Sequence, residues 1–264
     1  NQTIIVDNKP GGEGVISADF VAKSPPDGSV IYVGSSNSLI GTPILRGPSV
    51  VPYDPFKDFT PITQMGLFTL MWVVAPDLPV KNLQEFVEYV RARPGKLNYA
   101  SSNTTTRLAA LQVISQFKLD MLHVPYKGDA AAQTDLMANR VHFMVNTVAS
   151  GKGFVKDNRM KALMLQRGTR TPVLPDVPTT REAGAVIKIS PWSGIFGPGG
   201  MPPALVQHYA DAYRAAVSSK EVHERFEQLG FEPVPTTPQE MAQIHRNEYE
   251  VFRKAVQEDG IKFD

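Results

Sequence analysis

Short apolar segments of strand length alternate with segments of helical periodicity along most of this 264-residue chain. The segments that read as strands are residues 3–6, 29–34, 68–75, 97–100, 121–124, 141–145 and 160–165. Helical patterns lie between most of them; in residues 83–90, for example, apolar side chains recur at helical spacing behind Asn82, a favoured capping residue. This alternation predicts an α/β architecture with mainly parallel sheets.

The last third of the chain has a different pattern. Residues 205–213, 222–229 and 237–255 read as three consecutive helices with no strong strand between them. At the start of the third helix, Thr237 and Glu240 have the spacing of a capping box. We expect these helices to be packing elements and not to form a site.

The charge balance and the apolar segments exclude several classes of protein. There are 27 Lys and Arg residues against 26 Asp and Glu residues, with no basic stripe, so a nucleic-acid partner is not expected. No apolar run reaches the roughly 18 residues that a membrane-spanning helix requires. Because the chain has no cysteine, it has no disulfide, no thiolate metal ligand and no cysteine nucleophile.

Patterns typical of catalysis or of a cofactor are scarce. None of the five histidines forms a helical metal-binding pair with another, so we expect no metal site. The glycine cluster at residues 11–14 lacks the spacing of a nucleotide loop, so we expect no cofactor and interpret the cluster as a tight turn. A nucleophile at Ser101 or Ser102 would need a base and an orienting acid, which the spacing does not identify.

The strongest candidate for a binding site is the polar stretch between the segment 97–100 and the amphipathic run that follows it. A loop that leads from a strand into a helix presents unpaired N–H groups and a partial positive charge, which suit an anion. Arg107 adds a fixed cation beside this loop. The alternative is an ordinary helix cap in a polar surface loop. The candidate residues are Ser101, Ser102, Asn103, Thr104, Thr105, Thr106 and Arg107.

A second candidate lies at the end of the segment 121–124. Tyr126 offers an aromatic face and a hydroxyl group, Lys127 offers a charge, and Gly128 allows close approach of a ligand to the backbone. The alternative interpretation is a surface turn with a solvated lysine.

Six segments together resemble one known family. They read VDNKPGGEGVISADFVAKSPPDG, YDPFKDFTPIT, PGKLNYASS, HVPYKG, LPDVPTTREAG and WSGIFGPGGMPP, and they occur in the family's order along nearly the whole chain. The chain is thereby similar to the solute-binding receptors of tripartite tricarboxylate transporters, also called Bordetella uptake gene proteins.

The resemblance implies a type II periplasmic-binding-protein fold, in which two α/β lobes enclose a ligand in an interlobe cleft. Lobe 1 would comprise residues 1–77 and 196–264, and lobe 2 would comprise residues 78–195. The resemblance further implies a monomeric, periplasmic, non-enzymatic receptor without a cofactor. It would bind a small carboxylate (a dicarboxylate, tricarboxylate, amino acid or aromatic acid) and deliver it to the membrane permease subunits. Two alternatives are a ligand sensor with a signalling partner and a serine hydrolase.

The resemblance also implies a site made from one strand-to-helix loop of each lobe. It places the loop at 101–106 on the lobe 2 wall, with Tyr126, Lys127, Gly128 and Asn146 as further lobe 2 candidates. On the lobe 1 wall it implies Ser35, Ser36 and Asn37. The sequence departs from the family here, because NTTTR is shorter than the usual glycine-rich loop and Arg107 stands where a histidine is usual.

The family's first strand, Pro-Phe-Pro-x-Gly-Gly loop and helix have no match in this sequence. Since a central strand cannot simply be deleted from a parallel sheet, we expect one of three outcomes. The unit lies outside this sequence, another chain donates a strand, or residues 3–6 shift into the gap. In each case a ligand would contact lobe 2 more than lobe 1.

Overall fold

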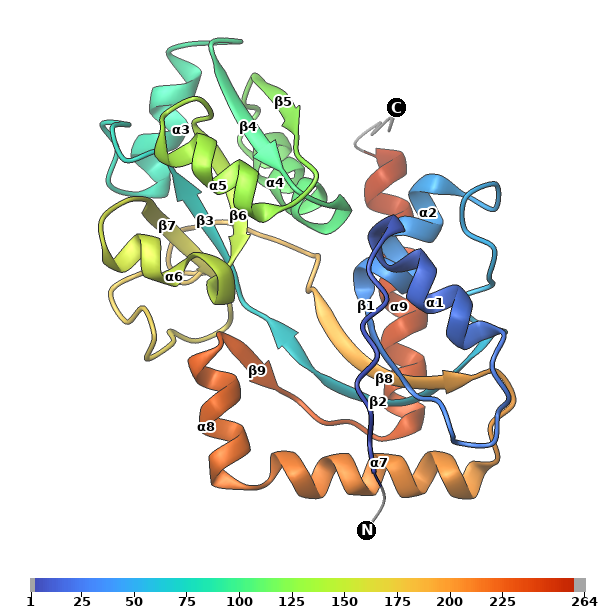
Figure 1. The fold of residues 1–264 in the computed structure, drawn as a ribbon. Coiled ribbons are helices and arrows are strands. Elements are labelled where there is room, and N and C mark those ends of the chain that lie inside the picture. Colours follow the sequence, from blue (N-terminus) through green and yellow to red (C-terminus); the bar gives the residue numbers. More distant parts are fainter. Residues whose placement is uncertain (1–2, 259–264) are drawn as a thin grey trace.

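Two β-sheets, each covered by helices, make up residues 3–258, the part of the chain that the computed structural model describes (Figure 1). The first sheet has the strand order β1 (Tyr32–Ser35), β8 (Trp192–Pro198), β2 (Phe59–Phe68), β9 (Phe231–Pro233). The second has the order β5 (Met121–Pro125), β4 (Leu97–Ser101), β6 (Phe143–Thr147), β3 (Leu70–Val74), β7 (Lys161–Gln166). The α/β prediction is confirmed.

The helices divide between the two sheets, and each sheet with its helices is called a lobe below. The first lobe holds the short helical turns η1 (Gly12–Gly14) and η2 (Asn37–Gly41), with α1 (Val15–Ala22), α2 (Thr42–Arg46), α7 (Pro203–Val217), α8 (Lys220–Gln228) and α9 (Pro238–Glu258). The second lobe holds α3 (Leu83–Arg91), α4 (Thr104–Gln116), α5 (Asp129–Met137) and α6 (Val148–Lys156). Among these described residues, no helix combines the length and apolar character needed to cross a membrane.

The core of the second lobe lies on both faces of its sheet. Every side chain of β3 is buried, as its continuous apolar sequence LMWVV predicts for a strand covered on both faces. Trp72 and Phe143 stack with ring centroids 5.4 Å apart on one face, while Met71 and Val73 pack on the other. The sheet is therefore a rigid support for the loops at its edge.

The strand directions differ from the prediction. Parallel pairing is confined to β4 with β5 and β4 with β6, whereas every other described strand pair is antiparallel. The expectation of mainly parallel sheets is thus wrong. The physical reason lies in how the chain crosses between the lobes. Strand β2 leads through Thr69 directly into β3 and so carries the chain into the second lobe. Strand β8 then runs back in the opposite direction and pairs with β1 and β2.

The chain passes from one sheet to the other at residues that differ from the expected lobe boundaries at 77/78 and 195/196. All of β3 belongs to the second sheet, and all of β8 belongs to the first. The change therefore occurs at Thr69 and just before Trp192. A third difference is β9, which lies between α8 and α9 in the sequence and pairs with β2 at the edge of the first sheet. Its three residues are too few to show a strand pattern in the sequence.

Residues 3–6 form no strand in the structure. Ile4, Ile5 and Val6 are each at least 80% exposed, and the segment runs along the outside of the first lobe (Figure 1). Of the three outcomes, the shift of this segment into the sheet is therefore wrong for the described residues. The other two outcomes concern polypeptide beyond this sequence and stay predictions.

Candidate functional site

The loop between β4 and α4 has the strand–loop–helix arrangement that its sequence predicts. Asn103 caps α4, because its backbone is extended and its side-chain Oδ1 accepts a hydrogen bond from the Thr106 N–H at 3.0 Å. The Thr106 hydroxyl donates back to the Asn103 carbonyl oxygen at 3.1 Å. The cap and α4 thus fix the loop in position.

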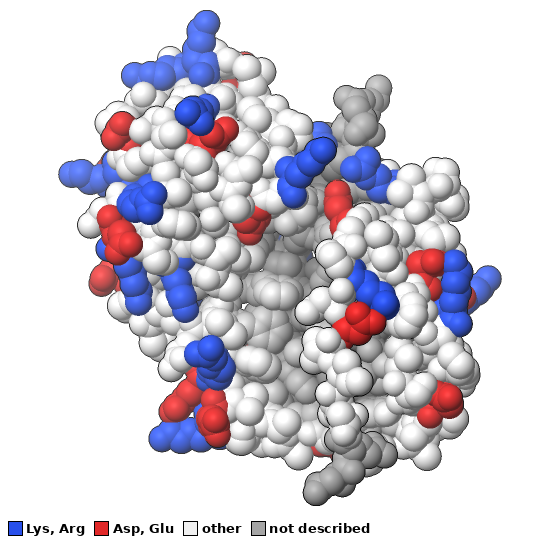
Figure 2. All heavy atoms as spheres, in the orientation of Figure 1, with Lys and Arg blue, Asp and Glu red and all other residues white. Residues whose placement is uncertain are grey.

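The first turn of α4 faces the first lobe. Thr104 Oγ1 donates to Glu13 Oε2 at 3.2 Å, and Thr105 Oγ1 donates to Asn37 Oδ1 at 3.4 Å. Gly41 permits this approach, since a Cβ at that position would lie 3.0 Å from Thr104 Cγ2. Because these contacts join the two lobes, the loop lies where the lobes meet. Figure 2 shows a hollow between the two lobes.

Glu13 stands on a left-handed turn. Its φ is 55°, and its neighbours Gly12 and Gly14 have φ of 57° and 93°. This confirms the interpretation of the glycine cluster as a tight turn. The turn directs the Glu13 carboxylate toward Thr104, with Thr42 Oγ1 at 3.5 Å and Arg46 at 3.6 Å. The sequence offered no sign that Glu13 would meet α4.

A hydrogen-bonded network joins the other side of the loop to the second lobe. The Ser102 hydroxyl donates to Asp129 Oδ1, and the Ser150 hydroxyl lies 3.3 Å from Asp129 Oδ2 and 2.6 Å from Asn146 Oδ1. Asn146 is fully buried, and its Nδ2 has no hydrogen-bond partner among the described residues. Asn146 is therefore part of the network behind the loop. Sequence reasoning missed Asp129, although an acid at the first position of a helix is a signal for such a role.

Ser101 pairs with a residue that the sequence did not connect to it. Its Oγ lies 2.7 Å from His123 Nε2. Burial, with the nearby Arg107 charge, lowers the pKa of His123 to about 4. An imidazole with so low a pKa is a weak base near neutral pH, and Ser101 itself is buried, so the pair does not favour the hydrolase alternative.

Arg107 lies within the second lobe. Its charge acts on Tyr99 and His123, and it opposes the rise that burial causes in the pKa of Tyr99. The structure thus brings Arg107 together with Tyr99 and His123 behind the loop.

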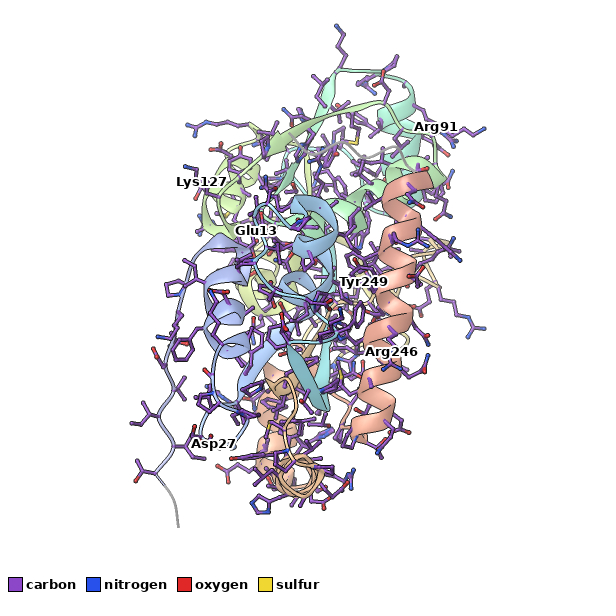
Figure 3. The ribbon with its side chains drawn as sticks, turned by 90° about the vertical axis from the view of Figure 1, so that its right-hand side faces the viewer. Glu13, Asp27, Arg91, Lys127, Arg246 and Tyr249 are labelled. Atoms are coloured by element: carbon purple, nitrogen blue, oxygen red, sulfur yellow. The ribbon has the colours of Figure 1, made fainter. Side chains whose placement is uncertain are left out.

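Tyr126 forms its side-chain hydrogen bond within the second lobe. Its hydroxyl donates to Asp135 Oδ2 on α5 at 2.7 Å, and burial together with this carboxylate raises the pKa of Tyr126 to about 12. Lys127 is exposed, and Figure 3 shows it on the same side of the molecule as Glu13. A Cβ at Gly128 would have open space around it, so a ligand could approach the backbone there.

The first-lobe candidates have three different environments. Ser36 is only 1% exposed, and its Oγ accepts a hydrogen bond from the Trp192 N–H at 3.4 Å. The expectation that Ser36 faces the cleft is wrong, because its hydroxyl satisfies a backbone donor at the start of β8. Ser35 Oγ lies 3.4 Å from Ser38 Oγ, whereas Asn37 Oδ1 accepts a hydrogen bond from Thr105 at the first turn of α4.

A second set of contacts joins the lobes far from the loop. Arg167, just after β7, makes two hydrogen bonds to the Glu227 carboxylate at 3.0 and 3.3 Å, and its Nε lies 3.5 Å from Glu232. The Lys152 ammonium group donates to the Gln228 carbonyl oxygen. These residues fasten α8 and β9 to the second lobe. Within residues 3–258 no group of three His, Asp or Glu side chains could hold a metal ion.

Comparison with known proteins adds an independent line of observation. A family model described as "Tripartite tricarboxylate transporter family receptor" matches residues 1–261. The UPF0065 protein of the tcbD-tcbE intergenic region in Pseudomonas sp. (strain P51) is 31% identical over 261 residues, which are 97% of this chain and 77% of that protein.

Two solved structures have the same fold. The structure of Rpa4515 of R. palustris with adipate is 28% identical, with a TM-score of 0.89 over 99% of this chain and 88% of that one. The structure of MatC (Rpa3494) from Rhodopseudomonas palustris with bound malate is 28% identical, with a TM-score of 0.79 over 93% of this chain and 85% of that one. The fold is that of the type II periplasmic binding proteins.

Proposed function

Because this chain belongs to the receptor family of tripartite tricarboxylate transporters, we propose that it captures a small carboxylate between its two lobes. The bound solute then passes to the membrane permease subunits of such a transporter. The receptor acts in the periplasm as a monomer, and it performs no chemistry on the solute. In the proposal, one lobe comprises residues 3–69 with 192–258, and the other comprises residues 70–191.

The observation that carries this proposal is the position of the first turn of α4. The loop that precedes it offers backbone N–H groups at the N-terminus of a helix of 13 residues, and it lies where the two lobes meet. Such a terminus stabilises a carboxylate through its donors and its partial charge. The ligand contacts in the proposal come from Ser102, Asn103, Thr104 and Thr105, with Lys127 and Gly128 beside them and Asn37 opposite.

The class of ligand follows from relatives with the same fold. One relative holds adipate and another holds malate, both small dicarboxylates. In the proposal the ligand is a small organic acid from the range that includes dicarboxylates, tricarboxylates, amino acids and aromatic acids.

Calorimetric titration with a panel of these acids, adipate and malate included, tests the proposal. We expect saturable binding of at least one acid, and a loss of about 2- to 10-fold in its affinity for the Thr105→Val variant, since one neutral hydrogen bond contributes about 0.5–1.5 kcal/mol. Valine keeps the shape of the side chain and removes only the hydroxyl.

Thr134→Val is the matched control, because Thr134 is an exposed residue whose hydroxyl bonds within α5 to the Ala130 carbonyl oxygen. The control should bind like the wild type. Absence of binding to every acid of the panel would contradict the proposed function.

A further inference from the structure

The anion-binding end of α4 already has a carboxylate beside it. Glu13 Oε2 accepts a hydrogen bond from Thr104, which is the first residue of α4, and it comes from the opposite lobe. Its other neighbours are the Thr42 hydroxyl at 3.5 Å and Arg46 at 3.6 Å. The carboxylate thus lies beside the helix terminus at which the proposed ligand would bind.

The side chains of the loop leave little that could offset this charge. Each polar side chain from Ser101 to Thr106 has a partner inside the protein: His123, Asp129, the Thr106 N–H, Glu13, Asn37 and the Asn103 carbonyl. One of these partners, Asp129, is a second carboxylate on the far side of the loop. Arg46 offsets Glu13 only in part, since its side chain is 44% exposed and solvated.

Two carboxylates close to one helix terminus repel each other. The repulsion between unit charges about 4 Å apart is small in bulk water and several-fold larger near a protein surface. A ligand that carries a carboxylate at both ends would place one of them beside Glu13. A ligand with a neutral or cationic second end avoids that repulsion, and an ammonium group can donate to the Glu13 carboxylate.

We propose that Glu13 is a specificity-determining residue of the cleft, which selects an acid with one carboxylate and a neutral or cationic group at its other end. This inference rests on the proposed function. It narrows the proposed range of small organic acids to monoanionic and zwitterionic ones. The two solved relatives, by contrast, hold dicarboxylates.

Three acids of matched length test the inference by calorimetry at low salt and pH 7. They are adipate, its monomethyl ester and δ-aminovalerate, whose second ends are anionic, neutral and cationic. For the wild type we expect δ-aminovalerate and the monomethyl ester to bind about tenfold or more tightly than adipate. In Glu13→Gln we expect adipate to gain about tenfold, the monomethyl ester to change little and δ-aminovalerate to weaken.

Glu88→Gln is the control for the change in net charge, because Glu88 is an exposed residue on α3 that bonds only to Gln84 among the described side chains. It should leave all three affinities unchanged. Thermal unfolding of Glu13→Gln establishes that the variant is folded, and Gln retains the size of Glu on its left-handed turn.

The outcomes separate the two claims. If the acids bind but the ratios of their affinities are the same in the wild type and in Glu13→Gln, the inference is overturned and the receptor function stands. A wild type that prefers adipate also overturns the inference. If neither protein binds these acids or any acid of the wider panel, the proposed function fails and the inference fails with it.

Discussion

His245 illustrates how single side chains depend on the core around them. The imidazole is 1% exposed among Trp192, Phe196 and Phe56, and its Nε2 donates to the Leu39 carbonyl oxygen at 3.3 Å. Burial lowers the pKa of His245 to about 4. The folded protein therefore requires the neutral form of this side chain.

This requirement predicts a loss of stability in acid. Between pH 6.5 and 4 the unfolded chain protonates His245 while the folded protein does not, so the stability present above pH 6.5 is lost as the pH falls. From pH 7 to pH 4 the wild type should lose about 3 kcal/mol more of its free energy of unfolding than His245→Gln. Urea denaturation at a series of pH values measures this difference.

Comparing the wild type with His245→Gln separates the contribution of His245 to the pH dependence of stability from that of its neighbour Glu248. Burial raises the pKa of Glu248 to about 8, which favours the folded state at low pH, but both proteins contain this group and its contribution cancels. Equal pH profiles for the two proteins would show that His245 titrates normally in the fold.

At the scale of elements, local signals in the sequence were reliable. The cap at Asn82 and the reciprocal bonds between Thr237 and Glu240 are present as predicted, because each involves residues three apart. Partners distant in sequence could not be predicted from the residues alone. Glu13 meets Thr104, and Ser36 meets the Trp192 N–H, only because the lobes and strands bring separate segments together.

The contacts of Arg167 with α8 and β9 are another such long-range feature. They predict that substitutions at two nearby arginines have unequal effects on stability. The Arg167 side chain is 7% exposed and holds two carboxylates, whereas Arg170 forms an exposed pair with Glu182. Arg167→Met should lower the free energy of unfolding by about 1–3 kcal/mol, because hydrogen bonds to charged groups are lost from a buried site.

Arg170→Met is the matched control and should cost less than about 1 kcal/mol, as expected for an exposed ion pair. Denaturation by urea at neutral pH compares the two variants. Equal losses would mean that the Arg167 contacts do not hold α8 and β9 to the second lobe.

At the scale of the molecule, the family resemblance predicted the two-lobed fold, and the alternation of segments predicted its α/β character. Neither revealed that β8 returns between β1 and β2, which makes the first sheet antiparallel. The sequence also located the loop at 101–106, since a capped helix behind a strand is a local pattern. It did not reveal that Arg167 and Glu13 join the lobes, because those contacts depend on how the lobes are placed.

The central claim is that a small organic acid binds at the first turn of α4 between the lobes. Nuclear magnetic resonance of the isotope-labelled protein, titrated with malate, adipate and the monomethyl ester of adipate, tests it most directly. We predict saturable shifts centred on the backbone amides of Ser102 to Thr105, with smaller shifts at Asn37 and Gly14 across the hollow. Shifts centred elsewhere, for instance on the groove of about 520 Å³ lined by Pro43, Tyr53 and Tyr249, or no saturable shift with any of these acids, would contradict the account.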